Sequence, residues 1–139
     1  MTTATHRFKL DDPRAGFTHK VHIGRLTGYI TVNADEQGAP REVFIHGFGG
    51  FGSTLQGFCD TFAIMLSISL QHGVTLHTLA GKFGRMTIEP NGETDNPEIP
   101  WCWSIPDYIV TLLVHKFGTT ELIHETEAIR RKDDRHHDH

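Results

Sequence analysis

The chain has 139 residues, of which 37% are hydrophobic and 22% charged, and its 17 acidic and 13 basic residues give a formal net charge of −4. That length suits one domain whose apolar core needs neither disulfides nor a metal ion for stability. The acidic balance excludes the broad basic field that holds duplex DNA or an anionic membrane, so we expect neither as a partner.

The first predicted elements are the strands of an antiparallel meander. Residues 1–16 are polar and are expected to form a loosely ordered arm. Alternating apolar and polar residues predict strands over 18–23, 28–33 and 41–46, and a turn-forming segment over 35–40 separates the last two. The short spacing between the strands favours antiparallel pairing.

Helices are predicted to follow the strands. The spacing of apolar residues predicts a helix that begins at Ser53 or Thr54 and ends at Gln71, before a stop at 72–73. A short second helix is predicted over 76–83. Another side of the first helix is polar and carries Gln56, Asp60, Ser67 and Gln71.

The rest of the chain alternates between irregular and helical segments. Residues 85–89 are predicted as a strand, and residues 90–100 as an irregular loop rich in Asn, Gly, Asp and Pro. Ser104 is the expected N-cap of a third helix. A fourth helix is predicted over 121–129, followed by a charged tail over 130–139.

Strands followed by helices favour an α+β fold. We expect a two-layer sandwich, in which a three-stranded meander plus at least one further strand packs against three main helices. The expected organisation is an arm over 1–16, an α+β domain over 17–118, and a helical extension with a His-rich tail over 119–139.

A glycine-rich segment, G-F-G-G-F-G-S-T from Gly47 to Thr54, is the best candidate ligand site. It joins a strand to a helix N-terminus, where glycines allow close backbone approach and first-turn amides attract anions. The segment fits G-x-G-x-x-G but lacks the acidic residue of a dinucleotide fold and the lysine of a P-loop, so a connection without ligand is an equal alternative. The expected phosphate-binding residues are Gly49, Gly50, Gly52, Ser53, Thr54 and, as the first-ranked cation, Arg85.

Other candidate chemistry is weak. Cys59 and Cys102 form no C-x-x-C motif, so we expect two reduced, buried thiols. No apolar run has transmembrane length and no signal peptide is recognisable, so we expect a cytoplasmic protein. The eleven histidines show no metal-binding pattern, and we predict no metal site and no cofactor. Asp60 and Asp107 lie within apolar helices, where we expect each to bond a backbone amide or a basic residue. No catalytic residue is predicted.

Several segments together resemble one family, the C-terminal TSCPD-type domain of the large adenosylcobalamin-dependent ribonucleotide reductases. The resemblance covers about Gly16 to Phe117. It is carried, in order and spacing, by Thr18-His19-Lys20, Gly28-Tyr29-Ile30-Thr31-Val32, Gly52-Ser53-Thr54, Leu70-Gln71-His72-Gly73-Val74, Lys82-Phe83, Glu89-Pro90-Asn91-Gly92 and Ser104-Ile105-Pro106-Asp107-Tyr108-Ile109.

The chain also departs from that family. Nothing in it resembles the catalytic barrel, the radical-generating cysteine, the active-site cysteine pair or the cobalamin site, and residues 124–139 replace the family's Cys-rich tail. The resemblance therefore implies a free-standing domain that cannot reduce ribonucleotides alone. Where the family tends to carry lysines, this chain has aromatic residues, at Phe48 and Phe51 and at Trp103, with Trp101 close by.

Aromatic side chains offer flat faces on which a nucleobase stacks, with about 1–3 kcal/mol per base in favourable cases. Phe48, Phe51, Trp101 and Trp103 are therefore the expected base-stacking residues. The alternative is that they pack in the core or in a subunit interface. Because they lie outside the periodic helices, they also predict a homo-oligomer.

These observations predict a non-catalytic binding module for a nucleotide or another phosphate-bearing small molecule. Phage proteins that sequester nucleotide signals in the host cytoplasm are one setting for such a module. The alternative is an accessory or regulatory domain that docks on a separately encoded ribonucleotide reductase. An independent enzyme is a third possibility, for which no catalytic set is visible.

Overall fold

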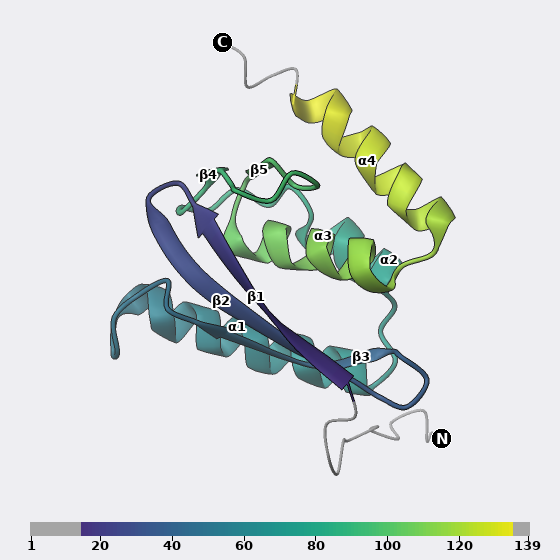
Figure 1. Cartoon of the computed structure of the whole chain (residues 1–139), viewed down its shortest axis with the longest axis horizontal. Helices are drawn as coiled ribbons and strands as arrows, with labels where there is room; N and C mark the ends of the chain where they lie inside the picture. Colours follow the sequence, from purple (N-terminus) through teal and green to yellow (C-terminus); the bar gives the residue numbers. More distant parts are fainter. Residues whose placement is uncertain (1–14, 135–139) are drawn as a thin grey trace.

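Three antiparallel strands form the main sheet, β1 (Ala15–Ile23), β2 (Leu26–Ala34) and β3 (Pro40–His46), in the order β1-β2-β3 (Figure 1). The computed structural model describes residues 15–134. The meander and the α+β fold are confirmed. The expected arm lies outside the described residues except at its end, because β1 already begins at Ala15.

A long helix, α1 (Thr54–Gln71), lies along β3 and closes that edge of the sheet. Ser53 is its N-cap and His72 its C-cap, as predicted. The polar side of α1 faces the strand, where its side chains satisfy backbone groups that would otherwise be open. The hydrogen bonds join Ser67 Oγ to Val43 N and O (2.9 and 3.2 Å), Gln56 Nε2 to Ile45 O (3.1 Å) and Gln71 Nε2 to Arg41 O (3.0 Å).

Three further helices complete the helical layer: α2 (Leu76–Phe83), α3 (Ile105–Phe117) and α4 (Thr120–Asp134). Helix α3 is central, since every residue from 105 to 114 is buried. Ser104 is its N-cap, as predicted. Helix α4 extends to Asp134, so the residues expected to begin a charged tail at 130 are helical.

The predicted strand over 85–89 is wrong. Arg85 has a positive φ of 64° and Met86 N bonds to Phe83 O, so the chain leaves α2 through a turn. The expected irregular loop instead contains a short strand, β4 (Gly92–Glu93), which pairs with β5 (Trp101–Cys102). Apolar and polar residues do alternate over 85–89, but the chain turns there after the end of α2 and does not form a strand.

One hydrophobic cluster joins the inner face of the sheet to α1, α2 and α3. Cys59 and Cys102 are free and buried within it, as expected. Burial raises the pKa of Cys59 to about 11 and that of Cys102 to about 12, so both are protonated thiols at neutral pH. Among the described helices, none combines the length and apolar character needed to cross a bilayer.

Candidate functional site

The glycine-rich segment forms a tight connection between β3 and α1. Ser53 N donates to Gly50 O (2.9 Å), and Ser53 Oγ accepts from Gln56 N (3.0 Å), which caps the helix. Gly52 has φ +78°, a conformation that favours glycine. Apart from the adjoining residues, no atom lies within 4 Å of where a Cβ would sit on Gly50 or Gly52, and both glycines are exposed, so the backbone is accessible there. The serine hydroxyl is already used as a cap.

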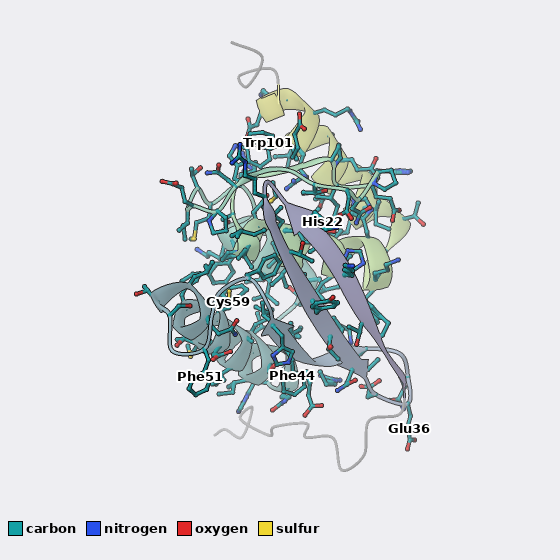
Figure 2. The ribbon with its side chains drawn as sticks, turned by 60° about the vertical axis from the view of Figure 1, so that its left-hand side comes forward. His22, Glu36, Phe44, Phe51, Cys59 and Trp101 are labelled. Carbon is teal, nitrogen blue, oxygen red and sulfur yellow. The ribbon has the colours of Figure 1, made fainter. Side chains whose placement is uncertain are left out.

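The two phenylalanines of this segment lie in opposite environments. Phe48 is 3% exposed, and its ring covers Gly28 so closely that a Cβ there would lie 2.3 Å from a ring carbon. Phe51 is fully exposed (Figure 2). Of the four expected stacking residues, Phe51 is therefore the one that a ligand at the glycines would meet directly.

The remaining expected site residues lie at a distance from the glycine-rich segment. Figure 2 shows Phe51 and Trp101 at opposite ends of the molecule. Trp101, Trp103 and Arg85 instead gather around a fully buried carboxylate, Asp107. The structure thus divides the expected residues into two groups, one at each end.

Asp107 is held by three donors. Its carboxylate accepts from Arg85 N (2.6 Å), Trp103 N (3.0 Å) and Arg130 Nη1 (2.6 Å). A buried charge is stable only when it is paired and hydrogen-bonded, and this one is both. The expectation that Asp107 bonds backbone amides and a basic residue is confirmed.

Arg130 is the residue of this cluster that sequence reasoning missed. Besides Asp107, its guanidinium donates to Thr111 Oγ1 (3.0 Å) and Trp101 O (2.7 Å), and it lies 5.0 Å from the Trp103 ring centroid. The sequence pattern that could have identified Arg130 is a spacing of four residues, since Leu122, Thr126 and Arg130 line one face of α4.

A cleft of about 240 Å³ lies beside this cluster, between α2, α3 and α4. Arg85 and Arg130 both line it, and both are paired, with Asp133 and Asp107 respectively. His77 Nε2 lies 3.5 Å from Glu125 Oε1 at its lining. Pairing neutralises both guanidinium groups, so the cleft offers an anion little net positive charge. Its volume is also below the range of about 300–1,000 Å³ that is typical of small-molecule sites.

A second polar network joins the sheet to α3. His19 Nε2 lies 2.7 Å from Tyr108 Oη, to which Asn96 Nδ2 also donates (2.9 Å). Burial raises the pKa of Tyr108 to about 12, while burial and the nearby Lys116 lower the pKa of His19. Both groups are therefore neutral at pH 7, which suits a structural hydrogen bond between the layers.

Metal binding and acid–base chemistry find no support at these positions. Within residues 15–134, no three His, Cys, Asp or Glu side chains are arranged to hold a metal ion. Asp60, the other candidate carboxylate, is exposed and accepts from Gln56 Nε2 (2.8 Å), which is a side-chain amide and not the backbone amide or basic residue that was expected. The histidines of 136–139 lie outside the described residues.

A groove of about 480 Å³ lies between β3 and α1. Its lining is mixed, with apolar residues such as Phe44 and Ile68 beside polar ones such as Glu42. Apolar side chains continue over the outer side of α1, where Ile64 is 60% and Met65 61% exposed. We name this surface the apolar α1 face: it comprises Phe44, Ile64 and Ile68, which line the groove, and Met65 next to them on α1. It exists because α1 turns its polar side to β3, which leaves apolar residues facing water.

The comparisons with known proteins point to one family. The TSCPD domain model matches residues 6–116. The chain is 40% identical over 130 residues to the vitamin B12-dependent ribonucleotide reductases of Streptomyces avermitilis and Streptomyces coelicolor, a match that covers 90% of this chain and 13% of each enzyme. The corresponding enzyme of Rhodopirellula baltica is 39% identical over 107 residues, or 77% of this chain and 10% of the enzyme. No solved structure matches the chain.

Proposed function

The chain belongs to the TSCPD domain family, and from that membership we propose that it is an accessory or regulatory module of a ribonucleotide reductase. The matched relatives are reductases, and the chain spans 13% or less of the three described above. The matching segment in those enzymes is joined to a much larger protein. A domain of this kind therefore suits a role as a partner of the catalytic subunit.

The observation that carries the proposal is the apolar α1 face. Monomeric proteins rarely expose contiguous apolar surface of large area, and patches of this kind commonly mark protein–protein contacts. The face combines a groove with protruding side chains such as Ile64 and Met65, which gives a partner both a recess and anchors. We propose that it docks on a separately encoded reductase subunit.

A non-catalytic role is supported by the state of the two thiols. Cys59 and Cys102 are buried, and burial raises their pKa values to about 11 and 12. A nucleophilic or redox-active cysteine needs thiolate character and access, and these two have neither.

Binding to the reductase encoded in the same genome tests this function. Met65→Glu adds a charge to the apolar α1 face and is expected to weaken the measured affinity at least about tenfold. Lys82→Glu, an exposed change on α2, is the matched control and should bind as the parent does. Calorimetry that shows no binding by the parent chain would contradict the proposal.

A second candidate function is the binding of a nucleotide or another phosphate-bearing molecule, including the capture of a nucleotide signal as phage anti-defence proteins do. The accessible backbone at Gly50 and Gly52 favours it, because a phosphate could approach the amides there without a steric barrier. Gly49, Ser53 and Thr54 complete the proposed phosphate site, with Phe51 as the adjacent stacking surface. Arg85, Trp101 and Trp103 would contribute only through a second contact region, and Phe48, whose ring is buried in the core, would support the segment from within.

A thermal-shift panel of mono-, di- and cyclic nucleotides tests the second candidate. A ligand at a hundred times its Kd stabilises the folded state by about 2.7 kcal/mol, which raises Tm measurably. Gly52→Val is expected to abolish the shift, because a β-branched residue disfavours φ +78° and obstructs the approach. Absence of any shift at millimolar nucleotide would rule this candidate out.

A further inference from the structure

The strand β1 forms the second edge of the sheet, and among residues 15–134 nothing covers most of that edge. In the order β1-β2-β3, strand β1 pairs only with β2 in the three-stranded sheet. Along its free side, Gly16, Thr18 and Lys20 are all exposed. We name these three residues the β1 edge.

The backbone groups of the β1 edge point away from β2. His22 N donates to Asp95 Oδ1 (2.9 Å), which lies outside the three-stranded sheet, so the His22 amide is directed outward. In an antiparallel strand the direction of the amide alternates with every residue. The amides and carbonyls of the β1 edge therefore face outward as well, and within residues 15–134 no hydrogen bond reaches them.

The other borders of the sheet are closed. The side chains of α1 cover β3, as described above. At the end of β1, Gly24 N bonds to Glu93 O (2.8 Å) and Ile23 bridges Thr94. The opening is thus confined to the first part of β1, with room for about three outward-facing residues of another strand.

We propose that the β1 edge pairs with the β1 edge of a second copy of this chain, antiparallel and about a two-fold axis at Thr18. In this register Thr18 lies opposite its own symmetry mate, and Lys20 lies opposite Gly16. The three residue pairs make about six backbone hydrogen bonds and join two three-stranded sheets into one of six strands.

The side chains of the β1 edge favour this occupant. Gly16 has no side chain of its own, and the Asn33 amide lies over it, with Oδ1 2.4 Å from where a Cβ would sit. Lys20 of the other copy would therefore meet a hydrogen-bond acceptor there and no like charge. The row that it enters continues through Asn33 to Glu42, which are themselves hydrogen-bonded (3.2 Å). A lysine entering a row that ends in a carboxylate is complementary in charge. A lysine usually protects an edge strand from pairing, but in this register Lys20 lies beside the polar row of the other copy.

The β1 side chains on the inner face of the sheet are also compatible with pairing between two copies. Phe17 and His19 point inward from β1 and are only half-buried. Phe17 stacks on Phe117 at 6.2 Å between ring centroids, and His19 stacks on Tyr108 at 5.9 Å. In the proposed register Phe17 of one copy faces His19 of the other, which covers both rings. The apolar α1 face lies along β3, at the opposite border of the sheet, and stays free for a reductase.

Sedimentation of two variants tests the pairing. The parent is expected to sediment as a dimer, with twice the 15.7 kDa mass of one chain. Thr18→Pro removes the central outward donor, which an edge strand tolerates, and should give a monomer that still folds by circular dichroism. Thr18→Val is the matched control. It loses the same hydroxyl contact with Thr31 (3.0 Å) but keeps the amide, and should stay dimeric.

Two results would overturn the proposal: a monomeric parent at 100 μM, or a Thr18→Pro variant that stays dimeric. Hydrogen exchange of the parent decides the matter if Thr18→Pro does not fold. Pairing between copies predicts that the Thr18 and Lys20 amides exchange at least about tenfold more slowly when the protein concentration is raised above the dimer Kd. Protection that does not depend on concentration would assign the edge to the chain's own residues 1–14, and absence of protection would leave it unpaired.

Discussion

Replacing Asp107 by alanine is expected to lower the free energy of unfolding by about 3–5 kcal/mol, which is a large part of the stability of a domain of this size. The substitution leaves the Arg130 guanidinium without its 2.6 Å partner and removes the acceptor of two backbone amides, those of Arg85 and Trp103. A buried charge without a partner is far more costly than the pair was favourable. Urea unfolding followed by circular dichroism measures the loss.

Asp60→Ala provides the control for this experiment. Asp60 is also a carboxylate within a helix, but it is exposed, and its removal should change stability by no more than about 0.5 kcal/mol. Equal effects of the two substitutions would show that the Asp107 cluster does not stabilise the fold. A shift in the denaturant midpoint with an unchanged slope would attribute the effect to the folded state.

Phe48→Ala is expected to cost about 3–5 kcal/mol, whereas Phe51→Ala, three residues later, should change stability by no more than about 0.5 kcal/mol. The Phe48 ring is 3% exposed and fills the space over Gly28, so its removal leaves a cavity beneath the sheet. Phe51 contacts water and has no packing to lose. Thermal and urea unfolding of the two variants give the comparison.

The Phe48→Ala and Phe51→Ala variants also distinguish packing in the core from stacking on a ligand. If Phe51 stacks on a nucleobase, Phe51→Ala should reduce the nucleotide-dependent rise in Tm while leaving the unliganded Tm unchanged. A large loss of stability in Phe51→Ala without ligand would contradict the exposed position of this ring. A stable Phe48→Ala variant would contradict its place in the core.

The elements that the sequence predicted well are those that local chemistry determines. Ser53 and Ser104 are N-caps because their hydroxyls accept from the amide three residues on, and this pairing needs no knowledge of the rest of the fold. Helix α2 begins and ends at the predicted residues for the same reason. The alternation within β2 reflects one buried and one exposed face of the sheet.

The sequence left open, or predicted wrongly, the features that tertiary contacts determine. The polar side of α1 faces β3 because the strand edge needs hydrogen-bond partners, and periodicity cannot tell a strand edge from water. The strand predicted over 85–89 was replaced by a turn at Arg85, whose positive φ is unusual for a residue with a side chain and is accompanied by its amide bond to Asp107.

The candidate site shows the same limit at the level of single residues. Phe48 and Phe51 lie in one glycine-rich segment and look alike in sequence, yet one is in the core and the other in water. Arg130 was assigned to a charged tail by composition, although it reaches Asp107, a residue 23 positions earlier. Only the packing of α4 against α3 brings these two side chains together.

The closure of β3 by α1 also determines how far this protein can polymerise. A sheet with two open borders can add strands without limit, which is how fibrils grow. Here Ser67, Gln56 and Gln71 occupy the backbone groups of one border, so a growing sheet could extend from β1 alone. Two chains joined through β1 would leave no open border of the three-stranded sheet among the described residues, and strand addition to that sheet would end at a closed pair rather than a fibre.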